Sequence, residues 1–262
     1  MILRAGWNFN ERLGARQMCG RYTLIKLSDF TDMFPWIRGP DEFPPARYNI
    51  APTQTVAVVP NDGKKQVDFF HWGLIPFWAK DPSIGNKMIN ARAETLAVKP
   101  AFRKALERRR CLIPADGFYE WKRNPDKTKT PMYIRMKSHR PFAFAGLWER
   151  WHSPDGSIVP SCTVITGKPN SLIRDIHDRM PVILKPEDYE KWLDPEVKDT
   201  EALESLLKPY PAEEMEANPV SARVNKATDD SPECIESMTD PPPPKDPPKR
   251  RKQAETEKGL FD

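Results

Sequence analysis

Segments with the character of β-strands follow one another through the middle of this chain and limit the folds that it can adopt. Runs rich in β-branched and aromatic residues, bounded by turn residues, are typical of strands. Such runs cover residues 55–59, 67–75, 132–136, 142–148 and 161–166. Helical patterns cover residues 24–34, 101–109, 170–176, 186–193 and 200–207. Because strands dominate the middle, we predict a single α+β domain with a mixed, largely antiparallel, barrel-like sheet and peripheral helices.

The chain has room for one large domain, and its composition differs at the two ends. It has 262 residues, and no linker-like segment interrupts it before the C-terminus. We interpret residues 1–17 as an extension that is absent from the mature protein, either because translation begins at Met18 or because a propeptide is removed. Residues 18–237 form the predicted catalytic domain. Residues 238–262 include prolines at 241–244 and many charges, so we predict a disordered tail.

The composition argues against a membrane-spanning protein, a secreted protein and a metal-binding protein. No apolar run approaches the ~18–20 residues of a membrane span, and residues 1–17 lack the hydrophobic centre of a secretory signal. The 4 cysteines form neither a C-x-x-C pair nor a metal-ligand spacing with the 4 histidines. We therefore expect a cytoplasmic protein without a metal or other cofactor. The formal net charge of +4 neither requires nor excludes nucleic acid as a ligand.

The pentapeptide Met18-Cys19-Gly20-Arg21-Tyr22 places a cysteine directly after an internal methionine. If this cysteine becomes the first residue, its thiol and α-amine form a 1,2-aminothiol, which condenses with an aldehyde to give a thiazolidine ring. The α-amine titrates near pH ~7.7–8.0, so a nucleophilic fraction exists at neutral pH. Taken alone, the pentapeptide favours an ordinary small buried cysteine.

Later segments supply the polar groups that such chemistry needs. They are residues 90–95 (NARAET), 114–121 (PADGFYEW) and 176–181 (IHDRMP). Together with residues 48–53 (YNIAPT), 72–76 (WGLIP), 219–221 (PVS) and 224–225 (VN), their order resembles that of the SRAP family. These are the SOS-response-associated peptidases, which process abasic sites in DNA. The resemblance extends roughly from Cys19 to Glu236.

The resemblance implies a stable DNA–protein crosslink at abasic sites in single-stranded DNA. The amine of Cys19 forms a Schiff base with C1′ of the opened sugar, and its thiol then closes the thiazolidine. Glu120 corresponds to the glutamate that handles protons at the amine, His177 to the histidine that assists ring opening and crosslink reversal, and Asn90 to the residue that orients the sugar. Because Glu120 stands between two aromatic residues, we expect desolvation to raise its pKa. A surface glutamate, a packed histidine and a turn asparagine are the alternatives.

Further candidates for DNA binding lie close to these positions. Arg21, Arg92 and Arg179 each follow a proposed catalytic residue by two positions. Because a guanidinium binds phosphate in a bidentate manner, we predict that they hold the DNA backbone beside the lesion, with structural ion pairs as the alternative. Trp72 and Trp121 are candidates for stacking on bases, with core packing as the alternative.

Three functions are compatible with the sequence. Covalent capture of abasic sites, with lyase or crosslink-reversal activity in the SOS response to DNA damage, explains why the cysteine follows a removable methionine. A cysteine peptidase, including one that processes itself, would use Cys19 as nucleophile with His177 and with Glu120 or Asn90 in support. A non-enzymatic module that binds single-stranded DNA would not need these four residues together.

The expected partner is single-stranded DNA that carries abasic sites, and we expect a monomer that is nucleoid-associated if bacterial. Leu260 and Phe261 end an otherwise polar tail, and they faintly resemble the Leu-Phe-ended peptides that bind the bacterial sliding clamp. The interpretations are a docking anchor for the clamp or an inert end.

Overall fold

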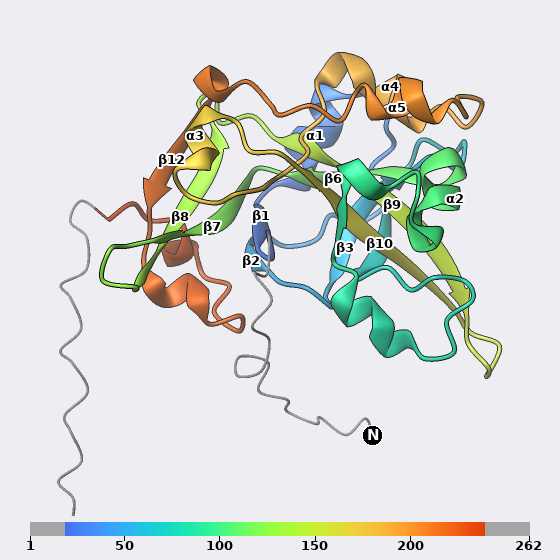
Figure 1. The fold of residues 1–262 in the computed structure, drawn as a ribbon, viewed down its shortest axis with the longest axis horizontal. Helices are drawn as coiled ribbons and strands as arrows, with labels where there is room; N and C mark the ends of the chain where they lie inside the picture. The colour runs from blue at the N-terminus through green and yellow to red at the C-terminus, as the bar shows by residue number, and fades with distance from the viewer. Residues whose placement is uncertain (1–18, 239–262) are drawn as a thin grey trace, which may run out of the picture.

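A computed structural model describes residues 19–238, which fold around two β-sheets (Figure 1). The predicted extension at residues 1–17 lies outside the described residues, as do Met18 and residues 239–262 of the predicted tail, which include Leu260 and Phe261.

The strands are β1 Tyr22–Leu24, β2 Arg47–Ile50, β3 Thr55–Pro60, β4 Asp68–Trp72, β5 Asn90–Arg92, β6 Arg110–Ala115, β7 Gly117–Arg123, β8 Lys129–Met136, β9 Phe142–His152, β10 Ile158–Gly167, β11 Met180–Pro181 and β12 Met215–Pro219. The α-helices are α1 Leu27–Met33, α2 Pro100–Arg108, α3 Ser171–Arg174, α4 Tyr189–Leu193 and α5 Thr200–Glu204. Short 3₁₀ helices cover Pro82–Lys87, Ala93–Thr95, Pro186–Asp188, Ala212–Glu214, Ala222–Asn225 and Pro232–Cys234.

The larger sheet closes into a barrel. Its strands follow the order β10-β4-β3-β6-β9, and β9 pairs again with β10. Every neighbouring pair in this ring is antiparallel except β10 and β4, which are parallel. The short strand β5 adds to β10 in parallel, and β11 adds to β10 in antiparallel fashion. The predicted α+β class with a mixed, largely antiparallel barrel-like sheet is confirmed.

The second sheet is antiparallel, in the order β12-β8-β7-β1-β2, and it extends to one side of the barrel (left in Figure 1). Its inner face shares the barrel's core through aromatic rings. The rings of Tyr22 and Phe118 meet the ring of Phe144 edge-on, with centroid separations of 5.7 and 6.0 Å. This packing ties β1 and β7 to β9, and so places both strands beside the barrel.

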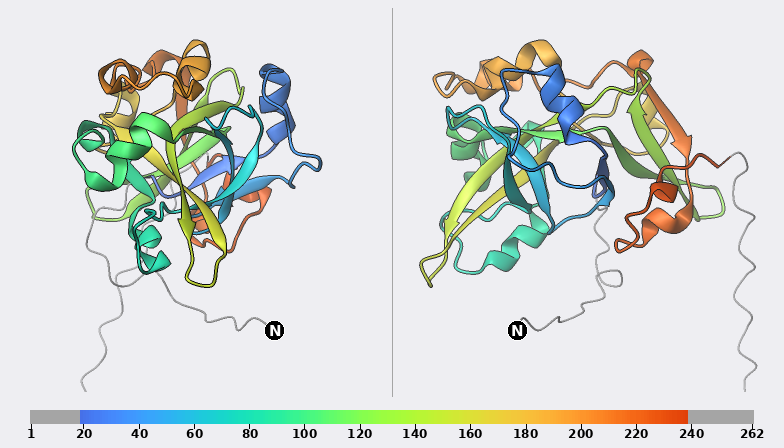
Figure 2. Two further views of the ribbon diagram at one scale, coloured as in Figure 1. Left: turned by 90° about the vertical axis from the view of Figure 1, so that its right-hand side faces the viewer. Right: turned by 180° about the vertical axis from the view of Figure 1, so that it is seen from behind.

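Helices α1 and α2 lie on opposite sides of the barrel (Figure 2), whereas α3 lies against β12 of the second sheet. In α2, Phe102, Ala105 and Leu106 recur at the spacing of one helical face and are buried. Pro100 in the first turn has the φ that a helix start requires. The predicted helix at residues 24–34 is shorter in the structure, because residue 24 belongs to β1 and the helix begins at Leu27.

Candidate active site

Cys19 is held by two side chains that come from distant parts of the chain. It precedes β1, which pairs with β7 through Tyr22 and Phe118. This pairing brings the Cys19 backbone N–H to Glu120 of β7, and it donates to Oε1 over 2.8 Å. At the start of β5, Asn90 donates from Nδ2 to the Cys19 carbonyl oxygen over 3.2 Å. The two contacts fix the Cys19 backbone between a carboxyl group and an amide.

Glu120 is almost completely removed from solvent, with 2% of its surface exposed. This burial raises its pKa from 4.5 to about 8, although the N–H groups of Cys19 and Trp121 stabilise the carboxylate and oppose the rise. The direction agrees with the sequence prediction. A carboxyl group with a pKa near neutral pH both accepts and donates protons readily.

The Cys19 thiol is also buried. Burial raises its pKa well above 9.0, and the negative charge of Glu120 raises it further, against a smaller lowering by the Arg21 backbone N–H. Within residues 19–238, no hydrogen bond joins this thiol to His177. The thiol is therefore protonated at neutral pH, unlike the thiolate that a cysteine peptidase uses.

A cavity of about 770 Å³ opens beside Cys19, between the second sheet and the loop that follows α3. Its lining includes Gly20, Arg21, Glu120, Trp121, His177 and Asn225. The acid–base groups of Glu120 and His177 therefore line the same cavity as Gly20, the residue that follows Cys19. Arg21 and Trp121 line it as well.

His177 is fixed in that loop through one nitrogen. The Arg179 backbone N–H lies 3.1 Å from the His177 Nδ1 atom and donates to it when Nδ1 is unprotonated. A carboxylate oxygen of Asp178 lies 3.2 Å from the same atom. Because Nδ1 is engaged within the loop, a bound substrate would meet Nε2.

Comparison with known proteins identifies the family to which this chain belongs. The family described as SOS response associated peptidase (SRAP) matches residues 18–227. The chain belongs to the SRAP family. "Abasic site processing protein YoqW" of Bacillus subtilis is 53% identical, over 84% of this chain and 100% of its own length. "Abasic site processing protein YedK" of Escherichia coli is 30% identical over 84% and 100%. A solved structure from Bacteroides thetaiotaomicron superimposes with a TM-score of 0.76 at 29% identity, covering 84% of this chain and 100% of its own.

Arg21 of this SRAP protein has a structural role. Its Nη1 donates to Asn49 Oδ1 over 2.9 Å and to the Val224 carbonyl oxygen over 2.7 Å. The Asn49 side chain in turn donates to the carbonyl oxygens of Val224, Lys226 and Asp229. Arg21 lines the cavity while one of its nitrogens is committed to this network, so its contact with phosphate stays a prediction.

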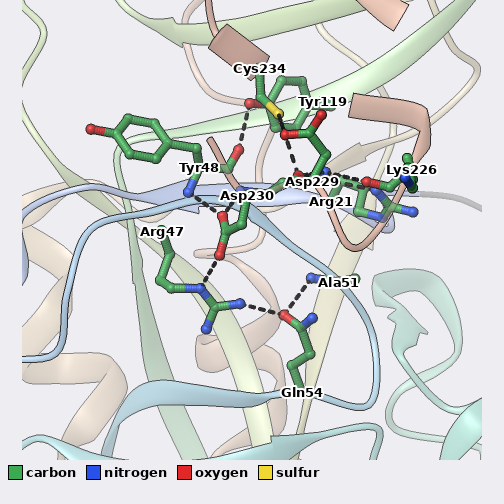
Figure 3. Close-up of polar contacts among 11 residues, drawn as sticks. Arg21, Arg47, Tyr48, Ala51, Gln54, Tyr119, Lys226, Asp229, Asp230 and Cys234 are labelled. Atoms are coloured by element: carbon green, nitrogen blue, oxygen red, sulfur yellow. Dashed lines mark hydrogen bonds and ion pairs between the residues drawn. The ribbon is translucent and has the colours of Figure 1, made fainter. Parts of the chain in front are cut away.

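Residues 224–234, which we call the clasp, are fastened to β2 by Asn49 and also by Asp230, which Figure 3 shows. The Asp230 carboxylate accepts from the backbone N–H groups of Tyr48 and Asn49, each over 2.6 Å, and pairs with Arg47 Nε at 2.5 Å. Because the clasp supplies the carbonyl that binds Arg21, it supports one wall of the site.

The other two predicted arginines differ from each other. Arg179 pairs with Glu94 through both terminal nitrogens, at 3.1 and 2.8 Å, and also donates to Thr166. It thus forms the structural ion pair that the sequence left as the alternative. Arg92 is exposed on β5. Neither arginine lines the cavity beside Cys19.

The two candidate tryptophans differ in their exposure to solvent. Trp72 is 1% exposed, donates from Nε1 to the Ile89 carbonyl oxygen, and packs against Tyr22. The predicted stacking of Trp72 on DNA bases is therefore wrong, because the closed barrel buries this ring. Trp121 is partly exposed, lines the cavity, and donates to Asn225 Oδ1 over 2.7 Å. A base in the cavity would meet Trp121.

Sequence reasoning misses several residues at this site. Arg123, Lys129 and Arg174 line the cavity, and no motif singles them out among the other basic residues. Asn49 lies in the quoted YNIAPT segment but receives no role from the sequence.

The structure also bears on metals and membranes. Within residues 19–238, no three His, Cys, Asp or Glu side chains lie close enough together to hold a metal ion. Over the same part of the chain, no helix has the length and apolar character to cross a membrane.

Proposed function

We propose that this protein processes abasic sites by capturing the sugar aldehyde covalently on Cys19. Relatives that match along their whole length are named abasic site processing proteins. The observation that carries the proposal is the 2.8 Å contact between the Cys19 nitrogen and Glu120 Oε1. This contact supports a role for Glu120 in proton transfer at the nitrogen that would attack the aldehyde.

The chemistry proceeds in two steps. The Cys19 α-amine attacks C1′ of the ring-opened sugar, and the resulting carbinolamine loses water to form a Schiff base. The thiol sulfur then bonds to C1′, and the thiol proton passes to the nitrogen, so one water is released overall. Glu120 takes a proton from the amine and supplies one to the departing hydroxyl. Ring closure is intramolecular, where effective molarities reach ~10⁵ M or more.

The arrangement suits a protonated thiol. The pKa of the Cys19 thiol is raised by burial and by the charge of Glu120, so the sulfur does not compete with the amine for the first attack. Once the imine has formed, the sulfur and C1′ are neighbours, and Glu120 passes the thiol proton to the nitrogen. Asn90 Nδ2 donates to the Cys19 carbonyl oxygen over 3.2 Å. This contact restrains the backbone of the residue that carries both nucleophiles.

The first step requires an α-amine, whereas a peptide bond to Met18 would leave an amide that forms no Schiff base. We therefore propose that the working protein begins at Cys19. Intact mass of the purified protein identifies its first residue, and full crosslinking by a protein that retains Met18 would refute the thiazolidine mechanism.

His177 extends the proposal to lyase action and to crosslink reversal. Its Nδ1 contacts Asp178 and Arg179 within the loop, so Nε2 is the nitrogen available to exchange protons with the sugar. Imidazole suits this task because it donates and accepts protons near neutral pH. We expect His177→Ala to slow ring opening and reversal by ~10²–10⁴-fold.

Peptidase action on other proteins has less support. A peptidase needs a thiolate activated by a neighbouring base, whereas burial and the charge of Glu120 raise the pKa of the Cys19 thiol, and among residues 19–238 no hydrogen bond joins that thiol to His177. Self-processing at the Met18–Cys19 bond stays a prediction. Clamp docking by Leu260 and Phe261, a monomeric state and nucleoid association also stay predictions.

The deciding experiment uses single-stranded DNA with one abasic site and compares the wild type with Cys19→Ala and Cys19→Ser, each prepared with residue 19 first. Both variants keep the α-amine and lose the thiol. We expect a heat-stable crosslink only with the wild type, and crosslinks with the variants only when borohydride reduces the Schiff base. Cys162→Ala, a cysteine buried in the barrel, is the matched control and should crosslink normally. Undiminished heat-stable crosslinking by Cys19→Ala would refute the proposal.

A further inference from the structure

Trp72 is enclosed by the barrel, yet its indole ring contacts both of the segments that meet at Cys19. It is the last residue of β4 and is 1% exposed. Its backbone is fixed by the pairing with Cys162 of β10 and by a 2.9 Å hydrogen bond from its N–H to the Gln54 carbonyl oxygen. The ring therefore extends from a rigid point in the barrel wall.

One contact of the ring is with the segment that carries Asn90. The Trp72 Nε1 atom donates to the Ile89 carbonyl oxygen over 2.9 Å. The Val164 backbone N–H donates to the same oxygen over 3.1 Å, and a carbonyl oxygen has two lone pairs that accommodate both donors. Because this carbonyl belongs to the peptide group between Ile89 and Asn90, the indole and β10 together orient the backbone that precedes Asn90.

The other contact of the ring is with β1. The rings of Tyr22 and Trp72 meet edge-on, with a centroid separation of 5.3 Å. Tyr22 is the first residue of β1, three positions after Cys19, and is itself 1% exposed. In a close-packed core neither ring moves without leaving a void. The indole thus connects the strand that follows Cys19 with the peptide group that precedes Asn90.

These two segments meet in the 3.2 Å hydrogen bond from Asn90 Nδ2 to the Cys19 carbonyl oxygen. Strand β5, which begins at Asn90, has three residues, and in the described part of the chain it pairs with β10 alone. A segment with so few contacts of its own is easily displaced. The hydrogen bond from the indole is consequently a substantial part of what holds Asn90 against Cys19.

We propose that Trp72 is a positioning residue for the capture of the abasic sugar and that it acts through Asn90. This inference rests on the proposed function, in which Asn90 restrains Cys19 during attack on the aldehyde. Loss of the indole N–H leaves the Ile89 carbonyl with one donor and allows β5 to shift relative to Cys19. A shift of about 1 Å in a positioning group slows a reaction by up to ~10²-fold.

The test compares two substitutions that remove the same kind of hydrogen bond. Trp72→Phe removes the Nε1 donor and keeps an aromatic ring in the core. Trp192→Phe is the matched control, because Trp192 of α4 is also buried and donates from Nε1 to the Cys111 carbonyl oxygen over 2.9 Å, away from the cavity beside Cys19. Both variants should lower the urea midpoint to a similar extent, since both lose a buried hydrogen bond.

Two quantities separate positioning from stability. The first is the rate of crosslinking at saturating abasic single-stranded DNA, and the second is the affinity for a strand with a tetrahydrofuran analogue, which has no aldehyde. We expect Trp72→Phe to slow crosslinking roughly 5- to 10-fold, the equivalent of one hydrogen bond, and to leave the affinity unchanged. Trp192→Phe should crosslink at nearly the wild-type rate. Equal rates for the two variants would overturn the proposal.

A double substitution shows whether Trp72 acts through Asn90. Asn90→Ala removes the side chain that the indole positions, so Trp72→Phe should cause no further loss of rate in that background. Persistence of the full loss there would overturn the proposal.

A second replacement keeps the test decisive if Trp72→Phe does not fold. Benzothienylalanine at position 72 retains the size of the indole and has sulfur in place of the N–H, and we expect it to slow crosslinking as Trp72→Phe does. A wild-type rate with this replacement would contradict the positioning role. Failure of the wild type to crosslink an aldehyde-bearing strand would instead refute the proposed function.

Discussion

Replacing Glu120 with glutamine should remove a large part of the pH dependence of this protein's stability. In the folded protein, burial raises the pKa of Glu120 from 4.5 to about 8. Between these values the unfolded chain has released the proton and the folded protein keeps it. The folded state therefore binds more protons, and the free energy of unfolding falls as the pH rises. The contribution is fully present below the unfolded pKa and is lost as the pH approaches 8.

The magnitude follows from the same two values. At 1.36 kcal/mol per pH unit, the difference between 4.5 and about 8 corresponds to about 5 kcal/mol when both states are ionised. Between pH ~5 and pH ~8.5 the expected loss is about 4 kcal/mol. Glutamine has nearly the same shape and still accepts the Cys19 N–H through its oxygen, so Glu120→Gln removes the titration without removing that contact.

Urea denaturation followed by tryptophan fluorescence, at several pH values between ~5 and ~8.5, measures the effect. The wild type should lose about 4 kcal/mol relative to Glu120→Gln over this range. Glu213→Gln, at an exposed position, controls for the loss of one acidic residue. A constant difference in unfolding free energy between wild type and Glu120→Gln at every pH would refute the reasoning.

Three further substitutions test other parts of the structure. Trp121→Ala should weaken binding of single-stranded abasic DNA by ~1–3 kcal/mol, whereas Trp121→Phe should retain most of the affinity; equal losses in a fluorescence titration would argue against stacking. Asp230→Ala should lower the unfolding free energy by about 2 kcal/mol, because two backbone N–H donors and Arg47 lose their acceptor; an unchanged urea midpoint would show that the clasp is not fastened there. Gly117→Ala should cost ~1–3 kcal/mol, since a Cβ at this glycine would lie 2.3 Å from the Tyr133 hydroxyl. The cost should shrink in a Tyr133→Ala background, and an equal cost there would contradict the clash.

Local sequence patterns determine much of the barrel. The predicted strands at residues 132–136, 142–148 and 161–166 fall within β8, β9 and β10, because β-branched and aromatic side chains favour extended backbone wherever they pack. The patterns do not predict β6 or β7. Every residue of β6 is buried, so this strand shows no alternation of polar and apolar side chains to mark it.

The sequence predicted correctly that the pKa of Glu120 is raised. It attributed the desolvation to the neighbouring aromatic residues, which is only part of the cause. Its aromatic neighbours Tyr119 and Trp121 pack together in a separate cluster with Tyr133, and alternation along a strand directs them away from the Glu120 side chain. The burial depends instead on the pairing of β1 with β7, which brings Cys19 across 101 residues of sequence to meet the carboxyl group.

The sequence by itself determined the family, the order of the motifs and the chemical types of the reacting groups, because these depend on side-chain chemistry and spacing along the chain. Only the tertiary structure decided which groups remain available to a ligand. Trp72 and Trp121 are the same residue type, yet closure of the barrel buries the first and leaves the second at the cavity. Arg179 pairs with Glu94, while Arg123 faces Lys129 across the β7–β8 hairpin and forms no ion pair within residues 19–238. Burial and charge pairing arise between residues far apart in sequence, so no local pattern specifies them.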